Sequence, residues 1–166
     1  MIKNVCLAIA ASTALIAGTA QAASDFFLKI VGITGTSQVV GFTDYIDIFS
    51  YSVGFTNGAC SSLNVMKKMD TASADITAAA LLGTTYPSAV LVGRKAGTQP
   101  FVYLRVTLTN VKVTSLQDSG SAGGDDVPTE SVSMQPSSVK IESFVQDSSG
   151  NSVLAATNTV SCQKLK

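Results

Sequence analysis

The fold is decided by V-M-K-K-M-D-T-A-S-A-D-I-T-A-A-A-L-L-G-T-T-Y-P-S-A-V-L-V-G-R-K-A-G, residues 65–97. This stretch contains the one convincing helix in a chain that otherwise has the pattern of strands. Ser73 is the predicted N-cap, because its hydroxyl can accept a hydrogen bond from a free backbone N–H of the first turn. Asp75 follows in that turn, where a negative charge suits the helix dipole. Gly83 can adopt the left-handed conformation that ends a helix.

One face of this helix is predicted to be small and apolar, with residues at helical spacing. Its members are Ala72, Ile76, Ala79, Ala80 and Gly83. Residues of this size let a helix lie close against a sheet or against a neighbouring subunit. A helix that plugs one end of a β-barrel is the plainer interpretation. After the helix, the chain is expected to turn through residues 84–87 and to enter a strand at residues 88–95.

Most of the remaining chain alternates apolar and polar residues, as half-buried strands do. In the long segment 101–115, the apolar positions shift from even to odd numbers after Asn110, which predicts a bulge there. Pro136 lies between two strand patterns and marks a bulge or a sheet edge. The other predicted strands are 25–32, 45–55, 130–134, 138–145 and 152–162. Because no βαβ unit repeats, the predicted fold is mainly β: an antiparallel β-barrel or sandwich with one attached α-helix.

The segment 45–55 has two unlike faces. Its odd positions are predicted to be buried, and they are Tyr45, Phe49, Tyr51, Val53 and Phe55. Its even positions begin apolar at Ile46 and Ile48 and then become small at Ser50, Ser52 and Gly54. Such a strand covers a core with one face and lines a wet surface with the other. An ordinary solvent-exposed strand face is the alternative for Ser50 and Ser52.

Residues 1–22 have the pattern of a secretory signal peptide. Lys3 provides a positive n-region, residues 5–18 are apolar but too short to span a bilayer, and Ala20-Gln21-Ala22 is a small-x-small cleavage site. Cleavage is predicted after Ala22, with Ala23 as the second choice. Residues 23–166 then form a single domain, expected to be exported to the periplasm or the extracellular space and to contain no membrane span.

Cleavage would remove Cys6 and leave Cys60 and Cys162 in an oxidising compartment. A disulfide between them is predicted. It would close a loop of about a hundred residues and stabilise the fold by roughly 4–5 kcal/mol in the chain-entropy model. Two unpaired thiols are the alternative.

The composition argues against catalysis, cofactors and metals. The chain has no His and no Trp, which removes Ser-His-Asp and Cys-His arrangements. Its candidate acidic side chains are scattered without a marked pair: Asp44, Asp47, Asp70, Asp75, Glu130 and Glu142. The loose segment 117–129 includes Asp125-Asp126 but lacks the ligand spacing of a calcium loop, so a solvated loop is predicted. Without Lys3 the net charge is −1 and no basic face is apparent, which excludes a nucleic-acid partner.

Six blocks occur in order along residues 26–134. They are F-F-L-K-I-V-G-I-T-G at 26–35, I-D-I-F-S-Y-S-V-G at 46–54, K-M-D-T-A-S at 68–73, R-K-A-G at 94–97, Y-L-R-V-T-L-T-N-V-K-V-T-S at 103–115 and P-T-E-S-V-S-M at 128–134. Together they resemble the Hcp (haemolysin-coregulated protein) family, the tube subunits of type VI secretion systems. No single block is specific, but the ordered set is.

The resemblance implies a β-barrel with an attached helix whose copies form hexameric rings that stack into a hollow tube. It implies as partners other copies of the chain, small effector proteins sheltered in the lumen and other secretion components. Ser52 matches a position that the family turns toward the lumen, and Ser50 shares its face. Two features depart from the family: the export signal, and Tyr51 and Val53 in place of paired Trp residues. A secreted monomeric module that binds a protein or a glycan is the alternative, and a secreted enzyme is not expected.

Overall fold

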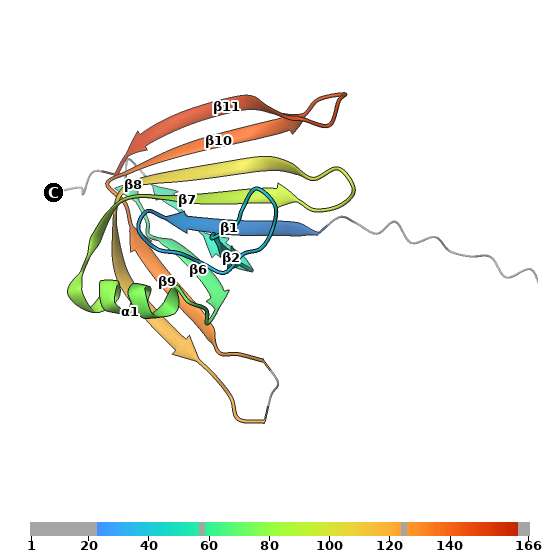
Figure 1. Cartoon of the computed structure of the whole chain (residues 1–166). Helices are drawn as coiled ribbons and strands as arrows, with labels where there is room; N and C mark the ends of the chain where they lie inside the picture. The colour runs from blue at the N-terminus through green and yellow to red at the C-terminus, as the bar shows by residue number, and fades with distance from the viewer. Residues whose placement is uncertain (1–22, 57–58, 124–125, 163–166) are drawn as a thin grey trace, which may run out of the picture.

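The computed structural model describes residues 23–56, 59–123 and 126–162, and the predicted signal peptide lies outside them. Figure 1 shows these residues as a β-structure with a single helix on one side. The elements in chain order are β1 (Ser24–Ile30), β2 (Ile46–Ile48), β3 (Ser50–Ser52), β4 (Phe55–Thr56), β5 (Ala59–Cys60), β6 (Leu63–Lys68), α1 (Ser73–Leu82), β7 (Thr85–Lys95), β8 (Phe101–Ser119), β9 (Thr129–Gln135), β10 (Ser138–Gln146) and β11 (Ser152–Ser161).

Nine strands form one antiparallel sheet, with the order β2-β1-β7-β8-β9-β6-β3 and a branch in which β10 pairs with β8 and β11 pairs with β10. β2 and β3 are consecutive pieces of chain at opposite ends of this order. Between them the Phe49 N–H donates to the Met66 carbonyl at 3.0 Å, so the sheet closes on itself. The fold is therefore mainly β, with antiparallel strands and one short helix, as the sequence predicted.

The core lies inside this closed sheet and beneath α1. Its largest members are Leu28, Ile30, Ile46, Leu63, Ile76, Leu91, Leu108 and Met134, all of them fully buried. They come from the inward positions of β1, β2, β6, β7, β8 and β9 and from the inner face of the helix. The period-2 pattern of the strands thus places one residue in two against the core.

The helix begins and ends close to the predicted positions, but Ser73 is not its N-cap. The cap position is Ala72, which has no side-chain hydrogen bond to the helix end, and Ser73 is the first helical residue. The Ser73 hydroxyl instead accepts from the Asp70 N–H at 2.9 Å and turns toward buried charged groups. Gly83 has φ 65°, and its N–H donates to the Ala79 carbonyl, as predicted for a left-handed C-terminus.

β8 is the longest strand, and near Asn110 its partner on one side changes from β10 to β9, while β7 remains its partner on the other side. Asn110 has φ 47°, and burial shifts there from Leu108 to Val111. Residues 104–109 pair with β10, whereas residues 112–119 pair with β9. The register with β7 continues unbroken past Asn110, and the register shifts of β8 lie opposite the Gly93–Arg94 step of β7 and between Val113 and Ser115. The predicted bulge at Asn110 is therefore wrong, although the apolar face of the strand does change there.

The prediction of one continuous strand over residues 45–55 is wrong, because the chain changes partners at Phe49. β2 pairs with β1, and β3 pairs with β6. The interruption shifts the inward positions by one, so that Ile46 and Ile48 are buried while Tyr51 packs on the core from an odd position. Phe49 and Phe55 remain 48% and 42% exposed, although both were expected to be buried.

Other boundaries also differ from expectation. β7 begins at Thr85 instead of at residue 88, and β8 continues to Ser119, well into the segment expected to be a loop. The expected loop 56–64 contains the β4–β5 hairpin and the start of β6.

A disulfide joins Cys60 to Cys162 across 102 residues. Cys60 ends β5, and Cys162 directly follows β11. The Cys162 N–H donates to the Ser137 carbonyl at 2.8 Å, and the Gln135 amide donates to the Cys60 carbonyl at 3.3 Å. The bond therefore ties the C-terminal strand to the corner between β9 and β10.

Candidate functional site

A polar surface is formed by the outward face of four neighbouring strands, β3, β6, β9 and the second half of β8. We call it the serine-rich face. Its members are Ser50, Ser52, Asn64, Met66, Lys68, Ser131, Ser133, Ser115, Gln117 and Ser119. The register places Ser50 opposite Met66 and Ser52 opposite Asn64, with both serines exposed. The opposite face of the same strands carries Val65, Val132 and Met134, which are buried.

Side chains on this face hold one another through short polar contacts. The Ser133 hydroxyl donates to the Asn64 Oδ1 at 2.6 Å, and the Ser62 hydroxyl at its border donates to Gln135 at 3.0 Å. The sequence identified Ser50 and Ser52 but missed the residues of β6, β8 and β9. The alternation S-V-S-M at residues 131–134 was the signal that could have found Ser131 and Ser133.

Directly behind this face lies a buried ionic cluster centred on Lys67. Its ammonium group contacts Glu130 Oε2 at 2.5 Å, Asp70 Oδ1 at 2.8 Å and the Ser73 hydroxyl at 2.9 Å. The Ser73 hydroxyl donates to the same Glu130 oxygen at 2.8 Å. Lys67 is 0% exposed and Glu130 1% exposed. The cluster joins β6, β9 and the start of α1, and the burial of Lys67 suits a role in positioning these elements.

The other acidic candidates are not brought together. Asp44 lies in the loop after β1 with φ 63°, and Asp75 lies on the first turn of α1. Glu142 pairs with Lys140 at 2.8 Å on β10. Of the six carboxylates named from the sequence, the structure joins only Asp70 and Glu130, and it joins them through a lysine.

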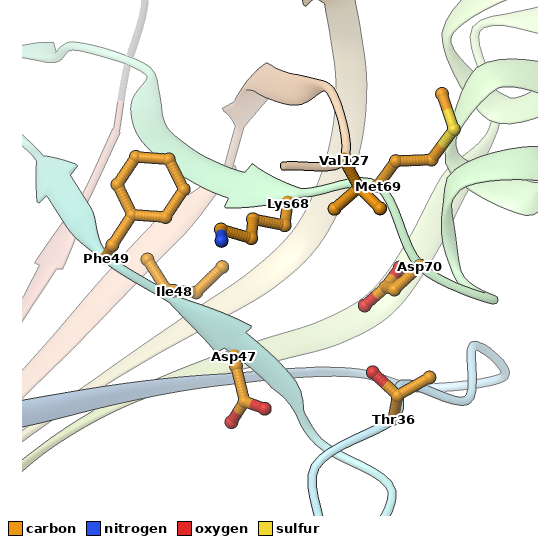
Figure 2. A pocket seen from close by; sticks show the side chains of 8 residues that line it. All are labelled: Thr36, Asp47, Ile48, Phe49, Lys68, Met69, Asp70 and Val127. Carbon is orange, nitrogen blue, oxygen red and sulfur yellow. The ribbon is translucent and has the colours of Figure 1, made fainter. Parts of the chain in front are cut away.

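An open groove of about 380 Å³ borders the serine-rich face where β6 ends. Figure 2 shows Phe49, Lys68, Met69 and Val127 around it, with Asp47 and Asp70 at its lower side. Thr36 and Ile48 complete the lining. We call it the Phe49 groove. Its mixture of exposed apolar side chains and ionised groups suits contact with a protein surface better than the enclosure of a small molecule.

Within residues 23–56, 59–123 and 126–162, no group of three His, Cys, Asp or Glu side chains is arranged to hold a metal ion. In the same part of the chain, α1 is too short to cross a bilayer.

Comparison with known proteins gives a consistent result. The family model described as "Type VI secretion system effector, Hcp" matches residues 27–142. The chain is 32% identical to Protein hcp1 of Pseudomonas aeruginosa in a match that spans 77% of this chain and 88% of that protein. It also resembles the crystal structure of Hcp1 from Salmonella typhimurium, with a TM-score of 0.72, 33% identity and coverage of 82% of this chain and 92% of that one. The structure of a type six secretion system protein matches with a TM-score of 0.77, 26% identity and coverage of 84% and 96%.

The closed sheet, the single helix and these matches define a β-barrel protein of the secretion-tube class. The chain belongs to the Hcp family of type VI secretion system proteins. This family is structural, which agrees with the sequence-based expectation that the chain is not an enzyme.

Proposed function

We propose that this protein is a ring-forming structural subunit related to type VI secretion, in which six copies form a ring and rings stack into a tube. The observation that carries the proposal is the family match over residues 27–142, supported by a structural likeness along most of the chain. Assembly is then the activity of the protein, and its partners are other copies and other secretion components.

The serine-rich face lines the lumen of the ring in this proposal. Ser52 lies near the edge of that face, where the family resemblance places a lumen position. The face is broad, and it is made mostly of short hydroxyl side chains, with Lys68 as its charged member. Short uncharged side chains leave room in a lumen and offer donors and acceptors to many protein surfaces. We propose small effector proteins as the cargo.

The proposal includes export of the protein, directed by the signal-peptide pattern of residues 1–22. Residues 1–22 direct secretion and are removed, and the Cys60–Cys162 bond forms in the oxidising compartment that the protein then enters. Production of the full chain in a secreting bacterium, followed by mass measurement of the product, is expected to show loss of residues 1–22. A product that retains these residues would contradict export by this route.

Assembly is tested by electron microscopy and native mass spectrometry of the oxidised, processed protein. Rings of six copies are the expected result. Single particles at high concentration, in material shown to be folded, would overturn the proposal and would favour the monomeric binding module.

Cargo binding is tested with Ser52→Arg, which adds a long cation to the serine-rich face. Ser121→Arg is the matched control, because Ser121 is exposed in the loop after β8. Both variants are expected to form rings. Only Ser52→Arg is expected to lose a small protein that co-purifies with the wild-type ring, and equal retention by both variants would contradict the lumen assignment.

A further inference from the structure

The helix α1 has an apolar inner face and an apolar stripe on its outer side. Its inner face packs on the barrel through Ile76 and Ala79. Its outward stripe consists of Ala74, Ala78, Leu81 and Leu82, at the i, i+4, i+7 and i+8 spacing of a single helix face. Leu81 and Leu82 are 82% and 81% exposed. The exposed Asp75 and Thr77 flank this stripe, so the apolar surface is confined to it. Two leucines this exposed beside each other mark the stripe as a surface for contact with another protein surface.

The hairpin of β10 and β11 is the second unusual surface. β11 has ten residues, none of them charged, and it pairs only with β10 among the described strands. Natural edge strands are usually protected by a charge, a proline or a bulge. β11 has a bulge opposite the Ser143–Phe144 step but lacks the other two devices. Its residues from Ser152 to Thr159 are exposed.

The two faces of this hairpin differ in charge. One face carries Lys140 and Glu142, with Arg105 beside them on β8. The opposite face, which continues the inward side of the barrel, carries no ionisable group. We call it the uncharged hairpin face, and its members are Ser143, Val145, Val153, Ala156 and Asn158. Val145 and Val153 lie opposite each other and are 55% and 45% exposed.

Three surfaces of this chain can be compared as partners for the helix stripe, and they differ in their charged and polar groups. The Phe49 groove is lined by Asp47, Asp70 and Lys68. The serine-rich face is polar, and burying leucines against its hydroxyls would leave those groups without partners. The uncharged hairpin face combines exposed apolar side chains with the absence of charge. The small residues Ala74 and Ala78 allow the helix to approach such a sheet closely.

We propose that the outward stripe of α1 in one copy packs on the uncharged hairpin face of the next copy around the ring. The inference rests on the proposed ring. A ring needs a heterologous contact between two different surfaces of the same chain. Figure 1 shows α1 at the lower left and the β10–β11 hairpin at the top, so the two surfaces lie on different parts of the molecule.

The test is a charge-pair exchange at the two surfaces. Leu82→Glu and Val153→Lys each place an unpaired charge in the contact. Each single variant is expected to raise the protein concentration needed for ring formation by about tenfold or more, because burial of the apolar side chain is lost. The double variant is expected to restore rings, since the two charges face each other across the contact. Met69→Glu is the matched control, because it adds the same charge to the Phe49 groove.

Ring formation is scored by native mass spectrometry, and each variant is first shown to unfold at the wild-type temperature. Rings that persist in both single variants, or a double variant that fails to recover, would overturn this contact while leaving the ring proposal intact. Loss of rings in Met69→Glu with retention in Leu82→Glu would place the contact at the groove instead and would also overturn it. A wild-type protein that stays single overturns the ring itself.

Discussion

Replacing Lys67 by methionine tests whether the buried ionic cluster holds α1 against the barrel. The ammonium group has three contacts between 2.5 and 2.9 Å, to Glu130, Asp70 and Ser73. Methionine fills a similar volume but leaves two carboxylates without their cation, in a place where Glu130 is 1% exposed. Removal of one partner from a buried ion pair costs about 3–5 kcal/mol. The melting temperature should then fall by about 6–20 °C for a domain of this size.

The adjacent lysine supplies the control. Lys68 pairs with Asp126 at 2.5 Å, but the two side chains are 51% and 81% exposed. Exposed pairs contribute about 0–1 kcal/mol, so Lys68→Met should leave stability almost unchanged. Both variants are measured by urea unfolding of the oxidised protein at neutral pH.

A second replacement separates the loss of the pair from a packing defect. Lys67→Met combined with Glu130→Leu removes the uncompensated charge at Glu130 and should recover a large part of the loss, because apolar replacements of buried ion pairs are often neutral. Equal stabilities for Lys67→Met and Lys68→Met would refute the assignment of Lys67 as the buried anchor.

Three further outcomes are expected. Replacing Cys60 and Cys162 together by serine should cost about 4–5 kcal/mol in the chain-entropy model, and reductant should then change the melting temperature of the wild type but not that of the variant. Burial raises the pKa of Tyr51 above its ordinary value of 10.0, so the folded state holds the phenol proton more tightly than the unfolded chain does. Stability should therefore be retained below pH 10 and decline as the pH rises further, with a shallower decline in Tyr51→Phe followed by circular dichroism. Gly35→Ala should destabilise by about 1–3 kcal/mol or more, because the new Cβ would overlap the Tyr45 carbonyl oxygen; unchanged thermal unfolding would contradict that close approach.

Local sequence patterns predicted an element correctly where that element keeps the same neighbours along its length. The helix and its glycine end were predictable, because each depends on residues close together in the chain. The change of apolar face at Asn110 was also visible in the sequence, but the bulge inferred from it was wrong, because the register with β7 continues there. The segment 45–55 failed because alternation cannot show where a strand changes partner. Because of the interruption at Phe49, the inward residues are Ile46 and Ile48 before it and Tyr51 after it, whereas Phe49 itself is exposed.

Long-range chemistry was harder to predict. Lys67 occupies an inward position of β6. A lysine at that position breaks the alternation of apolar and polar residues, so the strand could not be recognised from the sequence pattern. The partner of Lys67, Glu130, is 63 residues away, so no spacing in the sequence joins them. Two of the ten residues of the serine-rich face, Ser50 and Ser52, were identified from the sequence, whereas the residues of β6, β8 and β9 joined it only through the sheet order.

The nineteen-residue strand β8 has a mechanical consequence. Its first half supports the β10–β11 hairpin, its second half contributes Ser115 and Gln117 to the wall beside β9, and Asn110 is the bend between them. One continuous, bent strand thus connects the β10–β11 hairpin to the serine-rich face. A displacement of the hairpin would therefore reach the serine-rich face along one strand, without crossing a loop.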